Sequence, residues 1–79
     1  MHDARLAHSL QTLSTRELEV LQQIVDGLGP VQFAPILFIS PHTAKTHVKN
    51  IRRKLGAHSV LEIASIAVRS GILPTPPVR

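Results

Sequence analysis

The stretch from Ser40 to Gly56 constrains the fold of this chain more than any other part of the sequence. It begins with a serine and a proline, which together cap and open a helix, and it ends with a glycine, which closes one. Between them, apolar residues recur at steps of four, three and four, and they are Ala44, Val48, Ile51 and Leu55. This spacing predicts a helix over about residues 41–54 with one buried face.

Two more helices have clear start signals. In each, a serine stands three residues before a glutamate, the spacing at which a hydroxyl and a carboxylate satisfy the free backbone N–H groups of a helix start. The two pairs are Ser14 with Glu17 and Ser59 with Glu62. Apolar residues follow each pair at helical spacing, and Gly27 and Gly71 provide the stops. We expect helices over about residues 15–25 and 60–70.

The segment after Gly29 is the least regular of the predicted helices. Pro30 stands at a favourable first position, and the apolar residues that can share a face are Phe33, Ala34, Ile36 and Leu37. Pro35 lies within this run, where a proline removes one backbone hydrogen bond and clashes with the preceding turn. We expect a short helix over about residues 30–37 that is distorted or ends early.

The composition agrees with an all-α fold of four helices. Aromatic residues make up only 3% of the chain, so the core must be built from aliphatic side chains, which suit small packed helices better than a sheet. A chain of 79 residues supports one core. We assign residues 13–73 to the folded domain, 1–12 to an N-terminal linker or flexible segment, and 74–79 to a proline-rich tail.

The chain is strongly basic. Nine lysines and arginines against five acidic residues give a net charge of +4, a balance expected of a domain that binds a polyanion. The chain has no cysteine and no apolar run long enough to span a membrane, and its N-terminal residues lack the apolar stretch of a signal peptide. These observations exclude disulfides and predict a cytoplasmic protein without membrane contact.

The predicted helix over residues 41–54 is basic on the side away from its apolar stripe. Donors suited to phosphate or to base edges stand there, and they are His42, Lys45, Thr46, Lys49, Arg52 and Arg53. A short helix and a tight turn at residues 38–40 come before it. This arrangement has the form of a helix-turn-helix, in which the second helix enters the major groove of DNA.

Two linked motifs make this interpretation more specific. The first is the run Leu13-Ser14-Thr15-Arg16-Glu17-Leu18-Glu19-Val20-Leu21. The second consists of Ile39-Ser40, Thr43, Lys45, His47-Val48, Asn50-Ile51, Lys54-Leu55-Gly56 and Ser59, and it continues with Glu62, Ala64 and Gly71. The motifs cover most of the chain without a gap. The chain thereby resembles the LuxR/FixJ-type (GerE-like) C-terminal DNA-binding domains of bacterial response regulators and quorum sensors.

The resemblance implies a transcription regulator that binds double-stranded DNA. Carried over by position, it implies base contacts from Lys45, Thr46 and Lys49. It also implies phosphate contacts from Thr43, His47 and the basic end of the helix, to which physical reasoning adds His42, Arg52 and Arg53. Since family members usually carry a receiver or sensor domain upstream, we expect such a domain and RNA polymerase as further partners.

The resemblance also implies that the predicted fourth helix supplies much of a symmetric homodimer contact. The side chains of Ile63, Ile66, Ala67 and Ser70 cannot all be buried in so small a domain, and a leftover apolar strip favours dimerisation. We assign the dimer contact to Ile63, Ile66, Ala67 and Ser70.

The predicted second helix departs from the family pattern. Most members begin this helix with Ser-Asn-Lys-Glu, whereas this chain has Gly29-Pro30-Val31-Gln32 and lacks an asparagine and a lysine that typically face phosphate. Ala44 replaces a usual valine in the core. These differences support an alternative interpretation, a degenerate helix-turn-helix that serves as a protein-interaction or dimerisation module.

Other functions have little support in the sequence. The five histidines, at positions 2, 8, 42, 47 and 58, lack the spacing and the neighbouring cysteines or carboxylates of a metal site. There is no activated nucleophile, no glycine-rich phosphate loop and no pair of catalytic carboxylates. We therefore expect no enzymatic activity, no metal and no cofactor.

Overall fold

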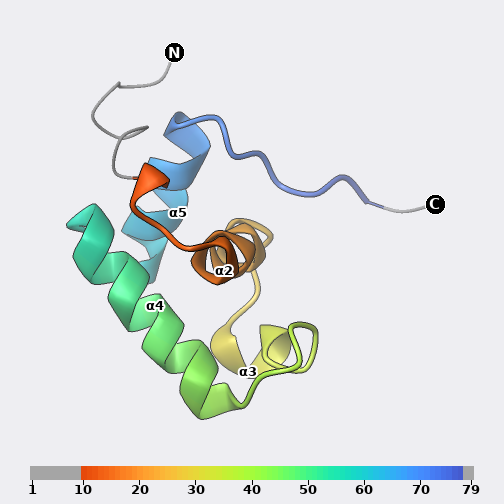
Figure 1. Cartoon of the computed structure of the whole chain (residues 1–79). Helices are drawn as coiled ribbons and strands as arrows, with labels where there is room; N and C mark the ends of the chain where they lie inside the picture. Colours follow the sequence, from red (N-terminus) through yellow and green to blue (C-terminus); the bar gives the residue numbers. More distant parts are fainter. Residues whose placement is uncertain (1–9, 78–79) are drawn as a thin grey trace.

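The computed structural model describes residues 10–77, and four helices lie wholly within this part of the chain, which contains no strand (Figure 1). They are α2 (Thr15–Val25), α3 (Pro30–Phe33), α4 (Pro41–Leu55) and α5 (Val60–Arg69). The predicted all-α fold is confirmed. The bounds of α2 are those predicted, while α4 and α5 end within one residue of their predicted ends.

The helices begin where the serine signals predict. At α2 the capping box is complete, because the Ser14 N–H donates to Glu17 Oε1 at 2.9 Å and the Glu17 N–H donates to Ser14 Oγ at 3.1 Å. At α5 the Ser59 hydroxyl accepts from the Glu62 N–H at 3.1 Å. The Glu62 carboxylate faces the His58 ring at 3.4 Å instead, so only half of the second predicted box forms.

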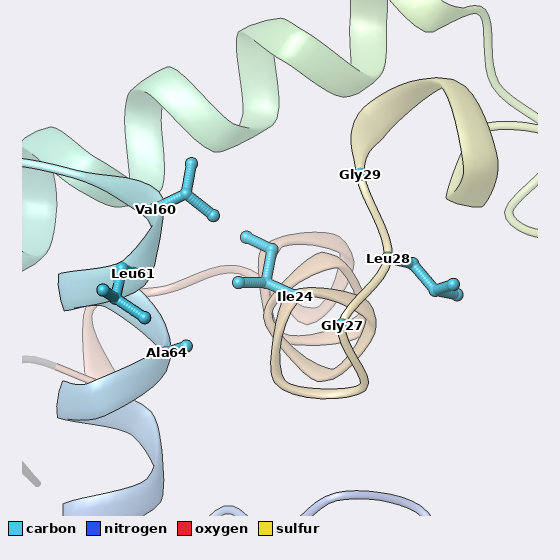
Figure 2. Close-up of a pocket in the computed structure, with 7 residues that line it drawn as sticks. All are labelled: Ile24, Gly27, Leu28, Gly29, Val60, Leu61 and Ala64. Atoms are coloured by element: carbon cyan, nitrogen blue, oxygen red, sulfur yellow. The ribbon is translucent and has the colours of Figure 1, made fainter.

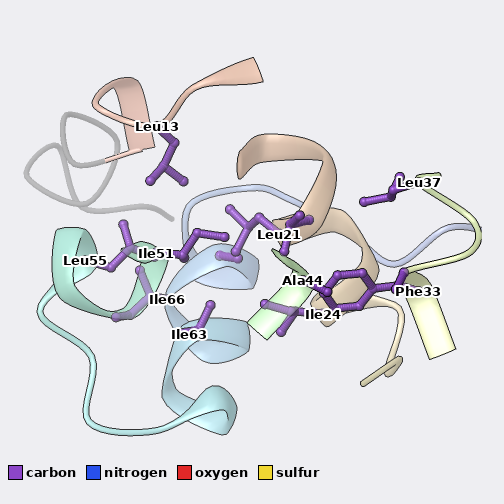
Figure 3. Packing of buried hydrophobic residues seen from close by; sticks show 13 residues of the cluster. Leu13, Leu21, Ile24, Phe33, Leu37, Ala44, Ile51, Leu55, Ile63 and Ile66 are labelled. Carbon is purple, nitrogen blue, oxygen red and sulfur yellow. The ribbon is translucent and has the colours of Figure 1, made fainter. Parts of the chain in front are cut away.

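One apolar core joins the four helices (Figure 3). Its largest fully buried side chains are Phe33, Leu21, Ile51, Ile63 and Val20. Because α2, α4 and α5 all pack against one another, while α3 packs against α4, the core lies among α2, α4 and α5 and is completed by α3. This packing leaves α4 along one side of the domain, with one face on the core and the other facing outward (Figure 1).

The helix α3 is shorter than the predicted range of 30–37. The Ala34 N–H still donates to Pro30 O at 2.9 Å, but Pro35 has no N–H to continue the ladder. The chain then follows a turn from residue 34 to 38, and Leu37 reaches the core from this turn rather than from the helix. The early end that Pro35 predicts is therefore confirmed, and the helix stops at Phe33.

The proline-rich tail forms no helix or strand up to residue 77, and it is attached to α2. The Thr75 N–H donates to Asp26 Oδ1 at 2.6 Å, and the Thr75 hydroxyl donates to Asp26 Oδ2 at 2.7 Å. Gln22 Nε2 donates to the carbonyl of Leu73 at 3.0 Å. The backbone N–H of Thr75 is the main reason why the pKa of the Asp26 carboxyl lies below its ordinary value.

Parts of the predicted terminal segments fall outside the described residues. These are residues 1–9 of the predicted linker and residues 78 and 79 of the tail. Within residues 10–77, no helix has the length and apolar character needed to cross a membrane.

Candidate nucleic-acid interface

The helix α4 is well defined at both ends by its own sequence. At its start, the Ser40 hydroxyl accepts from the Thr43 N–H at 3.0 Å, and Pro41 occupies the first helical position. At its end, Gly56 adopts a left-handed conformation with φ of 64°, which lets the Ala57 N–H donate to Arg52 O at 2.9 Å. These caps fix where the helix begins and ends relative to the core.

The two faces of α4 differ in chemistry as the sequence predicts. Ala44, Ile51 and Leu55 are buried in the core, and Val48 packs against it. The whole helix contains five lysines and arginines and no acidic residue. Because acidic side chains are absent, the outward face of α4 presents a single sign of charge.

The predicted base-reading residues lie together on the outward face of α4. Lys45, Thr46 and Lys49 are all exposed. Within the described part of the chain, neither lysine has an ion-pair or hydrogen-bond partner, so both ammonium groups are available to a ligand. Residues four apart on a helix are neighbours, and the two lysines therefore reach toward the same region.

Thr46 has a restricted hydrogen-bonding role. Its hydroxyl donates to the backbone carbonyl of His42 at 3.1 Å, so the proton of the hydroxyl is already used. The oxygen can still accept a hydrogen bond, as from the amino group of adenine or cytosine, and the methyl group can contact the methyl group of thymine. The geometry makes Thr46 an acceptor and an apolar contact rather than a donor.

The predicted phosphate-binding residues also lie on α4, but they are not equally accessible. His42, Arg52 and Arg53 are exposed, whereas Thr43 and His47 are half-buried. The Thr43 hydroxyl accepts from Ser40 Oγ at 3.0 Å, and the Arg53 guanidinium makes a long contact of 3.5 Å with Asn50 Oδ1. The structure brings all the predicted DNA-contacting residues onto one helix.

Sequence reasoning missed a residue that positions α4. Lys54 Nζ lies 2.8 Å from Glu17 Oε1, which links the last turn of α4 to the first turn of α2. The Glu17 side chain is buried, with 6% of it exposed, and the same oxygen accepts from the Ser14 N–H. Both partners were present in the quoted motifs, but nothing in a single sequence indicates that the two motifs meet here.

Opposing effects determine the pKa of the Glu17 carboxyl. Burial raises its pKa, but the hydrogen bonds from Lys54 and Ser14 and the charge of Lys54 outweigh burial and hold the pKa below the ordinary value of 4.5. A carboxyl whose pKa is lower in the folded state stabilises the fold above its unfolded pKa. This stability is lost as pH falls through the lowered folded pKa.

We therefore predict that Lys54→Met lowers the free energy of unfolding by about 1–3 kcal/mol at neutral pH, because it leaves a buried carboxylate without its partner. Urea unfolding measured between about pH 3 and 7 checks this. In the wild type, stability should fall below about pH 4.5. In the variant, the pKa of Glu17 rises, so the difference between the two proteins should shrink at acidic pH. A difference that is the same at every pH would contradict this account.

Most of the residues assigned to the predicted dimer contact lie on the core side of α5 and not on its free side. Ile63, Ile66 and Ala67 are buried in the core, and Ser70 is half-buried with its Oγ enclosed. All of these apolar side chains therefore do fit inside the domain, contrary to the expectation from its size. Two residues along a helix correspond to a rotation of about 200°, so the free stripe lies on the opposite side of α5.

The free stripe of α5 is mostly apolar, and it consists of Leu61, Ala64, Ser65 and Val68 at helical spacing, of which Ala64 is half-buried and the others are exposed. Leu61 is 81% exposed. Beside this stripe is a groove of about 360 Å³ between α5 and the end of α2 (Figure 2). Its lining residues are Ile24, Gly27, Leu28, Gly29, Val60, Leu61 and Ala64.

No candidate metal centre lies near these surfaces. Within residues 10–77, no three histidine, aspartate or glutamate side chains come close enough together to hold a metal ion.

The chain was compared with known proteins. The family described as "Bacterial regulatory proteins, luxR family" matches residues 11–67. Among curated relatives, a nitrate/nitrite response regulator protein homolog of Haemophilus influenzae is 50% identical over 50 residues, which are 63% of this chain and 24% of that protein. The transcriptional regulatory protein FixJ of Rhizobium meliloti is 39% identical over 66 residues, which are 84% of this chain and 32% of FixJ.

A third relative is YgeK of Escherichia coli K12, named as an uncharacterized response regulatory protein. It is 42% identical over 60 residues, which are 76% of this chain and 41% of YgeK. The chain thus spans less than half the length of each of these relatives. No solved structure gave a significant match. Because the family match covers α2, α3, α4 and most of α5, the chain belongs to the luxR family of bacterial regulatory proteins.

Proposed function

We propose that this chain binds double-stranded DNA through the outward face of α4 and acts as the effector part of a transcription regulator. The observation that carries the proposal is the face itself, since α4 holds five lysines and arginines, no acidic residue and two lysines without a partner in the described chain. Such a helix supplies both the electrostatic attraction and the donors that a major groove requires. Family membership supports the same function.

We assign two roles along α4. Lys45, Thr46 and Lys49 lie in its first turns, which are the turns that meet bases in a helix-turn-helix, and we assign them to base contacts. The phosphate contacts fall to His42, Thr43, His47, Arg52 and Arg53. Thr43 and His47 are half-buried, so their contribution depends on the DNA backbone approaching the helix closely.

We propose that the signal that controls this regulator is received by a region outside this chain. Two of the relatives are named response regulators or response regulatory proteins, and the chain spans only 24% and 41% of their lengths. We propose that a receiver or sensor domain lies upstream in the full protein and controls when α4 reaches DNA.

We also propose that two copies pair through the free stripe of α5. The stripe is mostly apolar and its first residue, Leu61, is largely exposed, so burying it against a second copy removes apolar surface from water. A groove lies beside it that can receive such side chains (Figure 2). A symmetric pair would place two copies of α4 on two half-sites of a DNA site.

The division of roles along α4 gives a direct test of the proposed function. Lys49→Ala should cost about 1–3 kcal/mol at the preferred DNA site and relax the preference among bases. Arg53→Ala should weaken binding to all sequences alike and make the salt dependence shallower. Selection from a pool of random duplexes, followed by titration of the selected and unselected sequences, measures both effects. Identical behaviour of the two variants would contradict the assignment.

A further inference from the structure

The turn between α3 and α4 contains an unusual residue. Phe38 has φ of 57°, and it is the only residue other than glycine with positive φ in the described chain. Its side chain is 94% exposed. A bulky aromatic residue rarely adopts the left-handed conformation, because its Cβ crowds the backbone, and the position normally takes glycine or asparagine.

The backbone around Phe38 explains how this conformation is held. The Phe38 N–H donates to Pro35 O at 3.3 Å, and the Ile39 N–H donates to Ala34 O at 3.0 Å, a pair of bonds typical of the glycine that closes a helical turn. The residues on either side, Leu37 and Ile39, pack on the core. The fold therefore needs a left-handed residue at this position but makes no use of the phenyl ring.

The position of the ring is consistent with a contact to a molecule outside the domain. Phe38 stands two residues before Ser40, the cap of α4, and is thus next to the end of α4 that carries His42, Lys45 and Thr46. Strained residues persist where the surroundings hold them and tend to cluster at functional sites. The exposed ring therefore lies close along the chain to the proposed DNA-binding face.

We propose that Phe38 is a DNA-contacting residue whose ring packs against deoxyribose at the edge of the major groove. The ring has no hydrogen-bonding group, so its partner must be an apolar surface. Because Phe38 precedes the turns of α4 that enter the groove, it lies beside the sugar–phosphate backbone rather than over the bases. This inference rests on the proposed function.

The test compares Phe38→Gly with Phe38→Leu. Glycine fits the left-handed conformation, so the thermal midpoint of Phe38→Gly should equal or exceed that of the wild type. Its dissociation constant for a short random-sequence DNA duplex should rise about five- to tenfold, the change expected from losing roughly 40–55 Å² of apolar contact at about 25 cal/mol per Å². Phe38→Leu keeps an apolar side chain and should bind within about twofold of the wild type.

Salt dependence separates this inference from the proposed function. An apolar ring releases no counterions, so the slope of log affinity against log salt should be the same for Phe38→Gly and the wild type. Unchanged affinity, a lower thermal midpoint or a changed slope in Phe38→Gly would each overturn the role of Phe38 alone. Wild-type protein that does not bind duplex DNA, or whose binding ignores salt, would overturn the proposed function and this role together.

Discussion

Phe33→Ala is expected to lower the free energy of unfolding by about 3–5 kcal/mol, because it removes a ring that is fully buried and leaves a cavity in the core. Figure 3 shows Phe33 entering the apolar cluster from α3. A domain of 79 residues has about 4–12 kcal/mol of stability in total. The variant should therefore be marginally folded, with a thermal midpoint lower by about 12–40 °C.

The matched control for this variant is Val31→Ala. Val31 lies on the same short helix but is 66% exposed, so its truncation should change stability by no more than about 0.5 kcal/mol. Thermal and urea unfolding of the two variants measure the difference. Similar unfolding of both variants would contradict the view that α3, despite Pro35, is anchored by its core side chain.

Leu61→Glu is expected to weaken specific DNA binding by about 10²–10⁴-fold while leaving the fold intact. The side chain is largely exposed, and a glutamate in the first turn of α5 suits the positive end of the helix. The new charge opposes burial of the stripe against a second copy, so each domain would bind DNA alone and lose the advantage of two linked half-sites. Sedimentation and DNA titration of the selected site check both consequences.

Leu18→Glu provides a control with the same change of charge. Leu18 is exposed on α2 and lies outside both the α5 stripe and the groove. Its added negative charge should weaken DNA binding only through the change in the net charge of the domain. A loss as large as that of Leu61→Glu, or a Leu61→Glu protein that still forms dimers, would contradict the proposed dimer contact.

The helix caps and the α4 stripe were predictable because their signals are local. A serine, a proline and a glycine set the bounds of α4, and four apolar residues at helical spacing determine which face is buried. The outward face then follows by elimination. The sequence alone could therefore predict that the DNA-contacting candidates, Lys45 and Lys49 among them, lie on α4.

The α5 stripe could not be predicted in the same way. Both sides of this helix are apolar, since Ile63 and Ile66 face the core while Leu61 and Val68 face outward. When a helix is apolar on two sides, periodicity cannot decide which side meets the core. Only the packing of α5 against α2 and α4 decides it, and that packing is a long-range property.

Long-range polar contacts could not be predicted from the sequence either. Glu17 pairs with Lys54, and Asp26 holds Thr75, across 37 and 49 residues respectively. The strain at Phe38 has a similar origin, because Pro35 ends α3 early and the chain must still turn into α4. In each case the neighbouring sequence does not indicate which residue is the partner or which conformation the backbone adopts.

The central claim is that the outward face of α4 binds the DNA backbone and grooves, and the salt dependence of binding tests it most directly. Each neutralised phosphate contributes about −0.9 to the slope of log affinity against log salt. Apart from Lys54, which pairs with Glu17, α4 has four exposed lysines and arginines, Lys45, Lys49, Arg52 and Arg53, and we predict a slope of about −2 to −4 per copy. Affinity for random duplex DNA should then fall roughly 16- to 250-fold between about 50 and 200 mM salt. A flat response would contradict the claim and favour a protein-interaction module.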